Sequence, residues 1–256
     1  MEGCRLAEEC IHGLDVPLCD ACYPKAKPEA VVAVKTRVPR VASGMRRSAA
    51  PAAHDDVSQQ RIYHITHISN LPGILAARAL VADASPEIDI SSDAVRESRR
   101  TIAVSDEGET VASYVPFFLS AESDVWDAVR FGTPDPRLDV DGEVVASDFV
   151  MLVSSVATVA DQSVVVADGD AAHPLTRFET TPDAADRALR KLRAEGETGR
   201  MRSAELLVRD EVPFELITLI TVANDKAKAA VRALVDPAGF RTRIAIHPPW
   251  FIRTPE

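Results

Sequence analysis

The chain has 256 residues, which suffices for one full domain with an appendage or for two small domains. Its formal net charge of −10 argues against a protein that coats nucleic acid over its whole surface. No apolar run approaches the roughly 18 residues of a membrane span, and the first ten residues, MEGCRLAEEC, carry charges and cysteines where a secretory signal needs an apolar block, so we expect a cytoplasmic protein.

All four cysteines lie in the first 22 residues, within the segment CRLAEECIHGLDVPLCDAC (4–22). A CxxC turn lets two thiolates converge on one tetrahedral ion, and a second pair upstream closes the site. Sulfur and imidazole ligands favour Zn²⁺, and a short segment without a core needs such a staple, so we predict a structural zinc element over residues 1–23. Its favoured ligands are Cys10, His12, Cys19 and Cys22, with Cys4 as the alternative to His12.

Residues 24–60 are interpreted as a flexible basic linker. Four prolines interrupt this stretch, which is otherwise rich in Ala, Val, Ser and basic residues. Residues 24–54 carry seven lysines and arginines against one glutamate, a net charge of +6, so the rest of the chain sums to −16. Such a cationic tether is compatible with contacts to nucleic-acid phosphates, although a solvated linker explains the same composition.

From Arg61 onward the sequence alternates between strand-like and helix-like segments, so we place one mixed α+β domain over residues 61–256. The expected strands are 61–65, 114–119, 148–155, 163–168, 204–208, 215–223 and 241–247. The expected helices are one capped by Ser69 or Asn70 that carries Leu71, Ile74 and Leu75 on one face, one capped by Ser120 that runs through Trp126 and Val129, one at 181–195, and one at 224–235 that Asn224 caps.

Glu205 is the first chemical clue, because it interrupts an apolar run, AELLV, that otherwise belongs in a core. Buried carboxylates are rare unless they are paired or functional, although a strand-end glutamate that faces water explains the same pattern. His67, Trp126, Phe117 and Phe118 are interpreted as structural residues, whereas Tyr114 fits either a structural or a functional role.

Several blocks occur in an order that resembles the DarT family of DNA ADP-ribosyltransferases. They are IYHITHISNLPGIL (62–75), VRESRR (95–100), SYVPFFL (113–119), MLVSS (151–155), SAELLV (203–208) and RIAIHPPWF (243–251). The first, third and fifth blocks are specific when they occur together, and the resemblance covers about residues 61–252. It implies an ADP-ribosyltransferase fold, with a mixed, split β-sheet and flanking helices.

The resemblance also implies roles for individual residues. His64 and Thr66 match the NAD-binding pair on the first strand, and Asn70 matches a further contact to the dinucleotide. Arg99 matches the essential arginine, with Arg100 as the alternative because the loop before Tyr114 differs by one residue. Glu205 matches the catalytic glutamate.

These residue types suit the chemistry. Cleavage of the bond between nicotinamide and ribose builds positive charge on the ribose, which a carboxylate stabilises. The planar fork of an arginine suits the pyrophosphate or the acceptor base. A histidine ring nitrogen can bond a ribose hydroxyl.

Two segments depart from the family pattern. Residues 121–126, AESDVW, replace a P-R-S-P-M-like stretch that shapes the cofactor pocket. The segment before Glu205, residues 187–202, holds six basic and two acidic residues but lacks the tryptophans that many members carry there. Its charge suits a phosphate backbone, whereas its missing aromatic residues leave the identity of the base open.

The sequence therefore predicts an enzyme that transfers one ADP-ribose unit from NAD to a base in single-stranded DNA. By the resemblance, the protein is a toxin whose partner is a macrodomain antitoxin. The alternatives are a transferase that acts on RNA or protein, and an inactive module that binds NAD or nucleic acid. The presence of both Arg99 and Glu205 favours an active enzyme, because an inactive relative is free to lose them.

The zinc prediction can be tested by elemental analysis of protein purified without chelator. About one zinc per chain is expected. Two disulfides or a redox-active CxxC, the alternatives for this cysteine cluster, predict no bound zinc. Disulfides fit poorly with the missing signal peptide, and a redox CxxC normally opens a helix after a strand.

Overall fold

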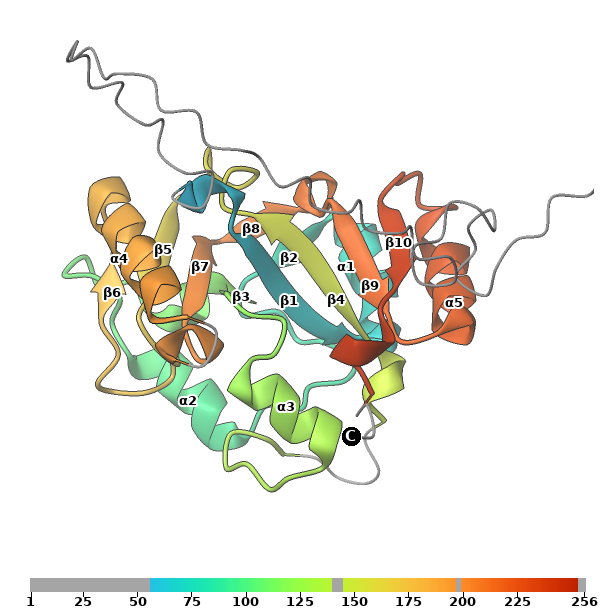
Figure 1. Cartoon of the computed structure of the whole chain (residues 1–256), viewed down its shortest axis with the longest axis horizontal. Coiled ribbons are helices and arrows are strands. Elements are labelled where there is room, and N and C mark those ends of the chain that lie inside the picture. The colour runs from blue at the N-terminus through green and yellow to red at the C-terminus, as the bar shows by residue number, and fades with distance from the viewer. Residues whose placement is uncertain (1–55, 140–144, 197–198, 253–256) are drawn as a thin grey trace, which may run out of the picture. The chain divides into compact units, whose positions relative to one another are not determined.

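The computed structural model describes residues 56–139, 145–196 and 199–252, all within the compact unit of residues 49–256 (Figure 1). The predicted zinc ligands Cys4, Cys10, His12, Cys19 and Cys22 lie outside the described residues. Within the described part of the chain, no group of three His, Cys, Asp or Glu side chains is placed to hold a metal ion. None of the helices described there has the length and apolar character that a bilayer span requires.

A large mixed sheet forms the centre of the fold. Its strand order is β10-β9-β4-β1-β3-β7-β5-β6, and every neighbouring pair is antiparallel except β9 and β10. The strands are β1 (Arg61–His67), β3 (Tyr114–Phe118), β4 (Phe149–Ser155), β5 (Val164–Ala167), β6 (Phe178–Glu179), β7 (Glu205–Arg209), β9 (Leu219–Val222) and β10 (Arg243–Ile246), while β2 (Ala79–Val81) and β8 (Glu211–Pro213) form a separate pair.

Helices cover both faces of this sheet (Figure 1). They are α1 (Leu71–Ala77), α2 (Asp93–Thr101), α3 (Asp124–Phe131), α4 (Pro182–Glu195) and α5 (Asp225–Val235). Buried side chains of α1, α4 and α5 join the largest apolar cluster, on one face. Trp126 and Val129 of α3 pack with Phe251 in a second cluster on the other face.

Alternation along the central strands assigns side chains to these two faces. On β7, Leu206 and Val208 belong to the largest cluster, whereas Leu207 belongs to a third cluster on the opposite face. Glu205 shares its face with Leu207 because the two residues are separated by two positions. The carboxylate is thus directed away from the largest apolar core.

The sheet splits between β1 and β3. All seven residues of β1 are in register with β4, from Arg61 opposite Ser155 to His67 opposite Phe149, but the register with β3 contains only Tyr63 opposite Phe118. Beyond this pair the two strands diverge. The predicted mixed sheet is therefore confirmed, and its strands separate between β1 and β3.

Most predicted elements are confirmed, including the α5 cap, where Asn224 Oδ1 accepts a hydrogen bond from the Ala227 N–H. Three details were wrong. The Ser120 hydroxyl accepts from Glu122 N–H in a turn, and α3 is instead capped by Ser123. The predicted strand 215–223 is shorter, because a 3-10 turn precedes β9. Asn70 precedes α1 but makes no side-chain cap, because its amide has other partners. The helix α2 and the short strands β2, β6 and β8 were not predicted.

Candidate active site

A cleft of about 1120 Å³ opens where the sheet splits. Its walls come from β1, β3, the first residue of β7, the segment 80–91 and one side of α2. The residues that it brings together include all five predicted for catalysis and NAD binding: His64, Thr66, Asn70, Arg99 and Glu205.

Glu205 is the first residue of β7. Its position is fixed by strand pairing, opposite Phe118 of β3 and Ala167 of β5. It is only 4% exposed. Its Oε1 accepts a hydrogen bond of 3.0 Å from the Ala171 N–H, and its Oε2 lies 3.3 Å from Nη1 of Arg99. Burial raises the pKa of the Glu205 carboxyl above its usual value, Arg99 opposes this shift, and Asp170 adds to it.

Arg99 reaches Glu205 from the last turn of α2. Its side chain is 19% exposed, and its Nη2 is buried without a hydrogen-bond partner among the described residues. Buried donors are normally satisfied, so this unpaired N–H is available to a ligand oxygen. Arg100, the alternative, instead pairs with Asp83 at 3.4 Å in an exposed position.

His64 is held as a neutral acceptor at the other side of the cleft. Its Nδ1 lies 2.9 Å from the carbonyl oxygen of Pro116, and because a carbonyl can only accept, Nδ1 carries the hydrogen. Burial lowers the pKa of His64, and the charge of Arg99 lowers it further, against the effect of the Pro116 bond. Nε2 is therefore left with a lone pair, which suits a hydroxyl donor.

The side chains of Asn70 and Thr66 form a buried pair. The Asn70 amide donates to Thr66 Oγ1 at 3.0 Å and to the Ile88 carbonyl at 2.8 Å, and it accepts from the Ile88 N–H at 2.8 Å. In this arrangement Asn70 ties the segment around Ile88 to the end of β1, so it shapes the cleft wall.

Sequence reasoning missed three residues beside Glu205. Ala171 supplies the N–H to its carboxylate, Asp170 lines the cleft next to it, and Arg137 bonds Asp170 at 3.3 Å. The signal was weak, because all three belong to irregular segments without periodicity. The aspartate-rich stretch after β5 was the only hint.

The structural interpretations of aromatic residues hold for Trp126 and Phe117, which are buried. Phe118 is only partly buried and lines the cleft, so its assignment to the core was wrong. The Tyr114 hydroxyl donates to Glu109 at 2.7 Å, and burial raises the pKa of Tyr114 to about 12. His67 accepts from the Ser69 N–H and packs edge-on against Phe149, as a structural residue would.

The family model for DarT, described as an ssDNA thymidine ADP-ribosyltransferase, matches residues 63–252. The chain belongs to the DarT family. The predicted family, with its NAD-dependent ADP-ribosyltransferase activity, is thereby confirmed.

Curated and solved DarT relatives cover most of the chain. Proteins named DNA ADP-ribosyl transferase from Mycobacterium bovis and Mycobacterium tuberculosis are each 29% identical over 212 residues, which covers 73% of this chain and 86% of theirs. The Thermus sp. 2.9 DarT in complex with ADP-ribosylated ssDNA is 25% identical with a TM-score of 0.63, covering 75% of this chain and 96% of that one. The same DarT in complex with NAD+ gives a TM-score of 0.59, covering 75% and 98%.

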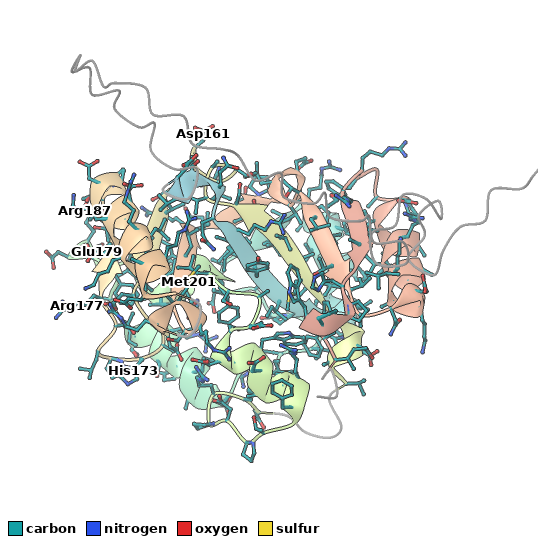
Figure 2. The ribbon with its side chains drawn as sticks, viewed as in Figure 1. Asp161, His173, Arg177, Glu179, Arg187 and Met201 are labelled. Carbon is teal, nitrogen blue, oxygen red and sulfur yellow. The ribbon has the colours of Figure 1, made fainter. Side chains whose placement is uncertain are left out.

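The two segments that depart from the DarT pattern have structural partners here. Ser123 and Trp126, from the stretch 121–126, begin α3 and enter its core. In the basic stretch 187–202, Arg200 pairs with Glu195 and Asp168, and Arg202 pairs with Asp124. Figure 2 shows Arg187 of this stretch on α4, at the left edge of the molecule.

The role of Asn70 can be tested with Asn70→Ala. This change leaves the Ile88 N–H and carbonyl without partners, so the free energy of unfolding should fall by about 1–3 kcal/mol. The affinity for NAD should fall about tenfold, equivalent to about 1.4 kcal/mol, because the cleft wall loses its tie to β1. Denaturant unfolding and calorimetric NAD titration measure the two effects.

Asn224→Ala is the matched control, because it removes the cap of α5, which does not line the cleft. It should lower stability by about 1 kcal/mol and leave NAD affinity unchanged. An Asn70→Ala variant that binds NAD as the control does would contradict this role.

The electrostatics of Glu205 predict its titration in the ligand-free protein. Its pKa should lie above the ordinary 4.5. Arg99→Met should raise the pKa further, because the lost positive charge favoured the ionised carboxylate. Activity that needs this carboxylate ionised should then rise with pH through the higher value. NMR titration of ¹³C-labelled glutamates, assigned with Glu205→Gln, measures the shift.

Arg100→Met serves as the comparison for this titration, since Arg100 pairs with Asp83 instead. It should leave the Glu205 pKa where it is. Equal shifts in both variants would show that Arg99 has no specific effect on Glu205.

Proposed function

We propose that the protein transfers ADP-ribose from NAD to a thymidine base in single-stranded DNA, with Glu205 as the catalytic carboxylate. The observation that carries this proposal is the ion pair in the cleft between Arg99 and the buried Glu205 carboxylate, with one Arg99 donor unpartnered among the described residues. The family description and the Thermus complex with ADP-ribosylated ssDNA support the acceptor.

Each predicted residue has a role that its geometry permits. The Glu205 carboxylate stabilises the positive charge that develops on the ribose as nicotinamide leaves. Arg99 holds that carboxylate through Nη1 and offers Nη2 to a ligand oxygen. The free Nε2 of His64 accepts from a ribose hydroxyl. Thr66 and Asn70 shape the wall against which the dinucleotide lies.

The reaction balances without any further reactant. The bond between the ribose and nicotinamide breaks, and a new bond joins the ribose carbon to an atom of the base. Nicotinamide leaves as a neutral molecule, and the base releases one proton. Burial raises the pKa of the Glu205 carboxyl, so activity that needs its ionised form should fall as the pH drops through that raised value.

Two finer parts of the proposal rest on other grounds. The toxin role, with a macrodomain antitoxin that removes the mark, follows from membership in the DarT family. The proposal of a structural zinc ion held by Cys10, His12, Cys19 and Cys22, with Cys4 as the alternative to His12, is supported by the spacing of these residues in the sequence. They lie outside the described part of the chain.

Incubation with labelled NAD and single-stranded DNA tests the function. Thymidine-containing oligonucleotides should acquire label, and a matched oligonucleotide without thymidine should acquire none. Glu205→Gln should reduce the rate of transfer by about 10³-fold or more. Loss of one preorganised group that stabilises transition-state charge typically costs about 10²- to 10³-fold, and Glu205 is the proposed catalytic carboxylate. Mass spectrometry of the product gives the site of attachment.

RNA of the same sequence and a mixture of cellular proteins are the competing acceptors. Label on RNA or protein alone would refute the DNA acceptor. No label on any acceptor, together with measurable NAD binding, would establish an inactive binding module.

A further inference from the structure

Arg137 bonds both Ser92, which caps the helix that carries Arg99, and Asp170, the neighbour of the residue that donates to Glu205. It is partly buried, and it lines the cleft. Its Nε and Nη2 donate to Asp135 at 2.9 and 2.6 Å, and its Nη1 donates to Asp170 at 3.3 Å. Arg137 thus joins two carboxylates from segments that are far apart in the sequence.

The side chain of Arg137 is linked to Glu205 through hydrogen bonds of Asp170 and Ala171. Asp170 also accepts from the Ala172 N–H at 2.8 Å, and its carbonyl accepts from Thr176 Oγ1. These bonds fix the turn that contains Ala171, whose N–H donates to Glu205. The Arg137–Asp170 pair therefore holds the group that orients the carboxylate.

The backbone of Arg137 is linked to the helix that carries Arg99. Its carbonyl accepts from the Ser92 N–H at 2.8 Å, and Leu138 forms a β-bridge with Ser91. Ser92 caps α2, and Arg99 lies in the last turn of that helix. No residue of α2 is fully buried, so these bonds at its start help to hold the helix in place.

We propose that Arg137 is a positioning residue that sets the separation between Arg99 and Glu205, acting on Glu205 through Asp170. This inference rests on the proposed transferase function. A misplacement of about 1 Å at a reacting group can lower a rate by about 10²-fold, so a brace of this kind matters for the rate.

Direct binding of NAD phosphates by Arg137 is the competing role. Each of its three guanidinium nitrogens already donates to a carboxylate. Two aspartates face one arginine, so the local charge is net negative and disfavours a pyrophosphate. The geometry favours positioning over ligand binding.

A double-mutant cycle with Arg137→Ala and Asp170→Asn tests the proposal in the full chain. Each single variant should lower kcat for transfer to single-stranded DNA by about 10- to 100-fold, with the KM for NAD within about threefold of the original. The double variant should be no slower than the slower single variant, because the two residues act as one unit. A raised KM with unchanged kcat, or effects that multiply, would overturn it.

Two further variants keep the outcome interpretable. Glu215→Gln breaks an exposed ion pair of 2.6 Å with Arg78, away from the cleft, and should leave kcat unchanged. Arg137→Lys keeps the charge but loses the fork, so it should retain an intermediate kcat. It replaces Arg137→Ala in the cycle if the alanine variant fails to fold.

Hydrogen exchange of the Ala171 amide gives a readout without catalysis. In the ligand-free protein, Arg137→Ala should speed this exchange at least tenfold, while Glu215→Gln should not. Unchanged exchange in a folded Arg137→Ala variant would overturn the proposal. If the unmodified protein transfers no ADP-ribose, the proposed function fails, and the exchange experiment still decides the role of Arg137.

Discussion

A carboxylate buried beneath the cleft is the constraint on which the rest of the site depends. Glu205 loses most of its hydration, and the structure compensates with one cation and one backbone N–H, supplied from segments distant in sequence. A buried pair of this kind contributes little net stability, and loss of either partner leaves an uncompensated charge. Its value is therefore chemical, and the pairing of β7 with β3 and β5 on its two sides gives it a rigid base.

The split of the sheet provides room for this pair and for a ligand. Divergence of β1 from β3 leaves backbone groups of β3 without strand partners, and Pro116 stands at this point of β3. A proline has no N–H to leave unpaired, and its carbonyl accepts from His64. Pro116 thus leaves no N–H unpaired at the open edge, and its backbone carbonyl there fixes the tautomer of His64.

The residues of the site could be predicted from the sequence more readily than the residues that hold them in position. Glu205 and the strands around it were predictable, because a carboxylate within an apolar run is a conspicuous exception to burial rules. Arg99 was identified through the family resemblance, but its helix was not predicted: α2 buries no side chain, so it lacks the apolar period that marks a helix.

Ser120 and Ser123 both accept a bond from a nearby N–H, and only the fold decides which one begins α3. The links from Arg137 to Asp170 and from Asn70 to Ile88 join separate segments through side chains, which no local pattern encodes.

The basic stretch 187–202 shows why charge alone does not define a nucleic-acid surface. Arg190, Arg200 and Arg202 are engaged by carboxylates, and Arg200 and Arg202 tie the residues before Glu205 to the segment after β5 and to α3. An exposed pair such as Arg190–Asp186 is worth about 0–1 kcal/mol, so a DNA phosphate can replace that carboxylate at little cost, whereas Arg200 and Arg202 each bond two carboxylates. Binding there would exchange one set of ion pairs for another and release fewer counterions than six free cations would. We therefore expect these three arginines to contribute less to DNA affinity than unpaired cations would.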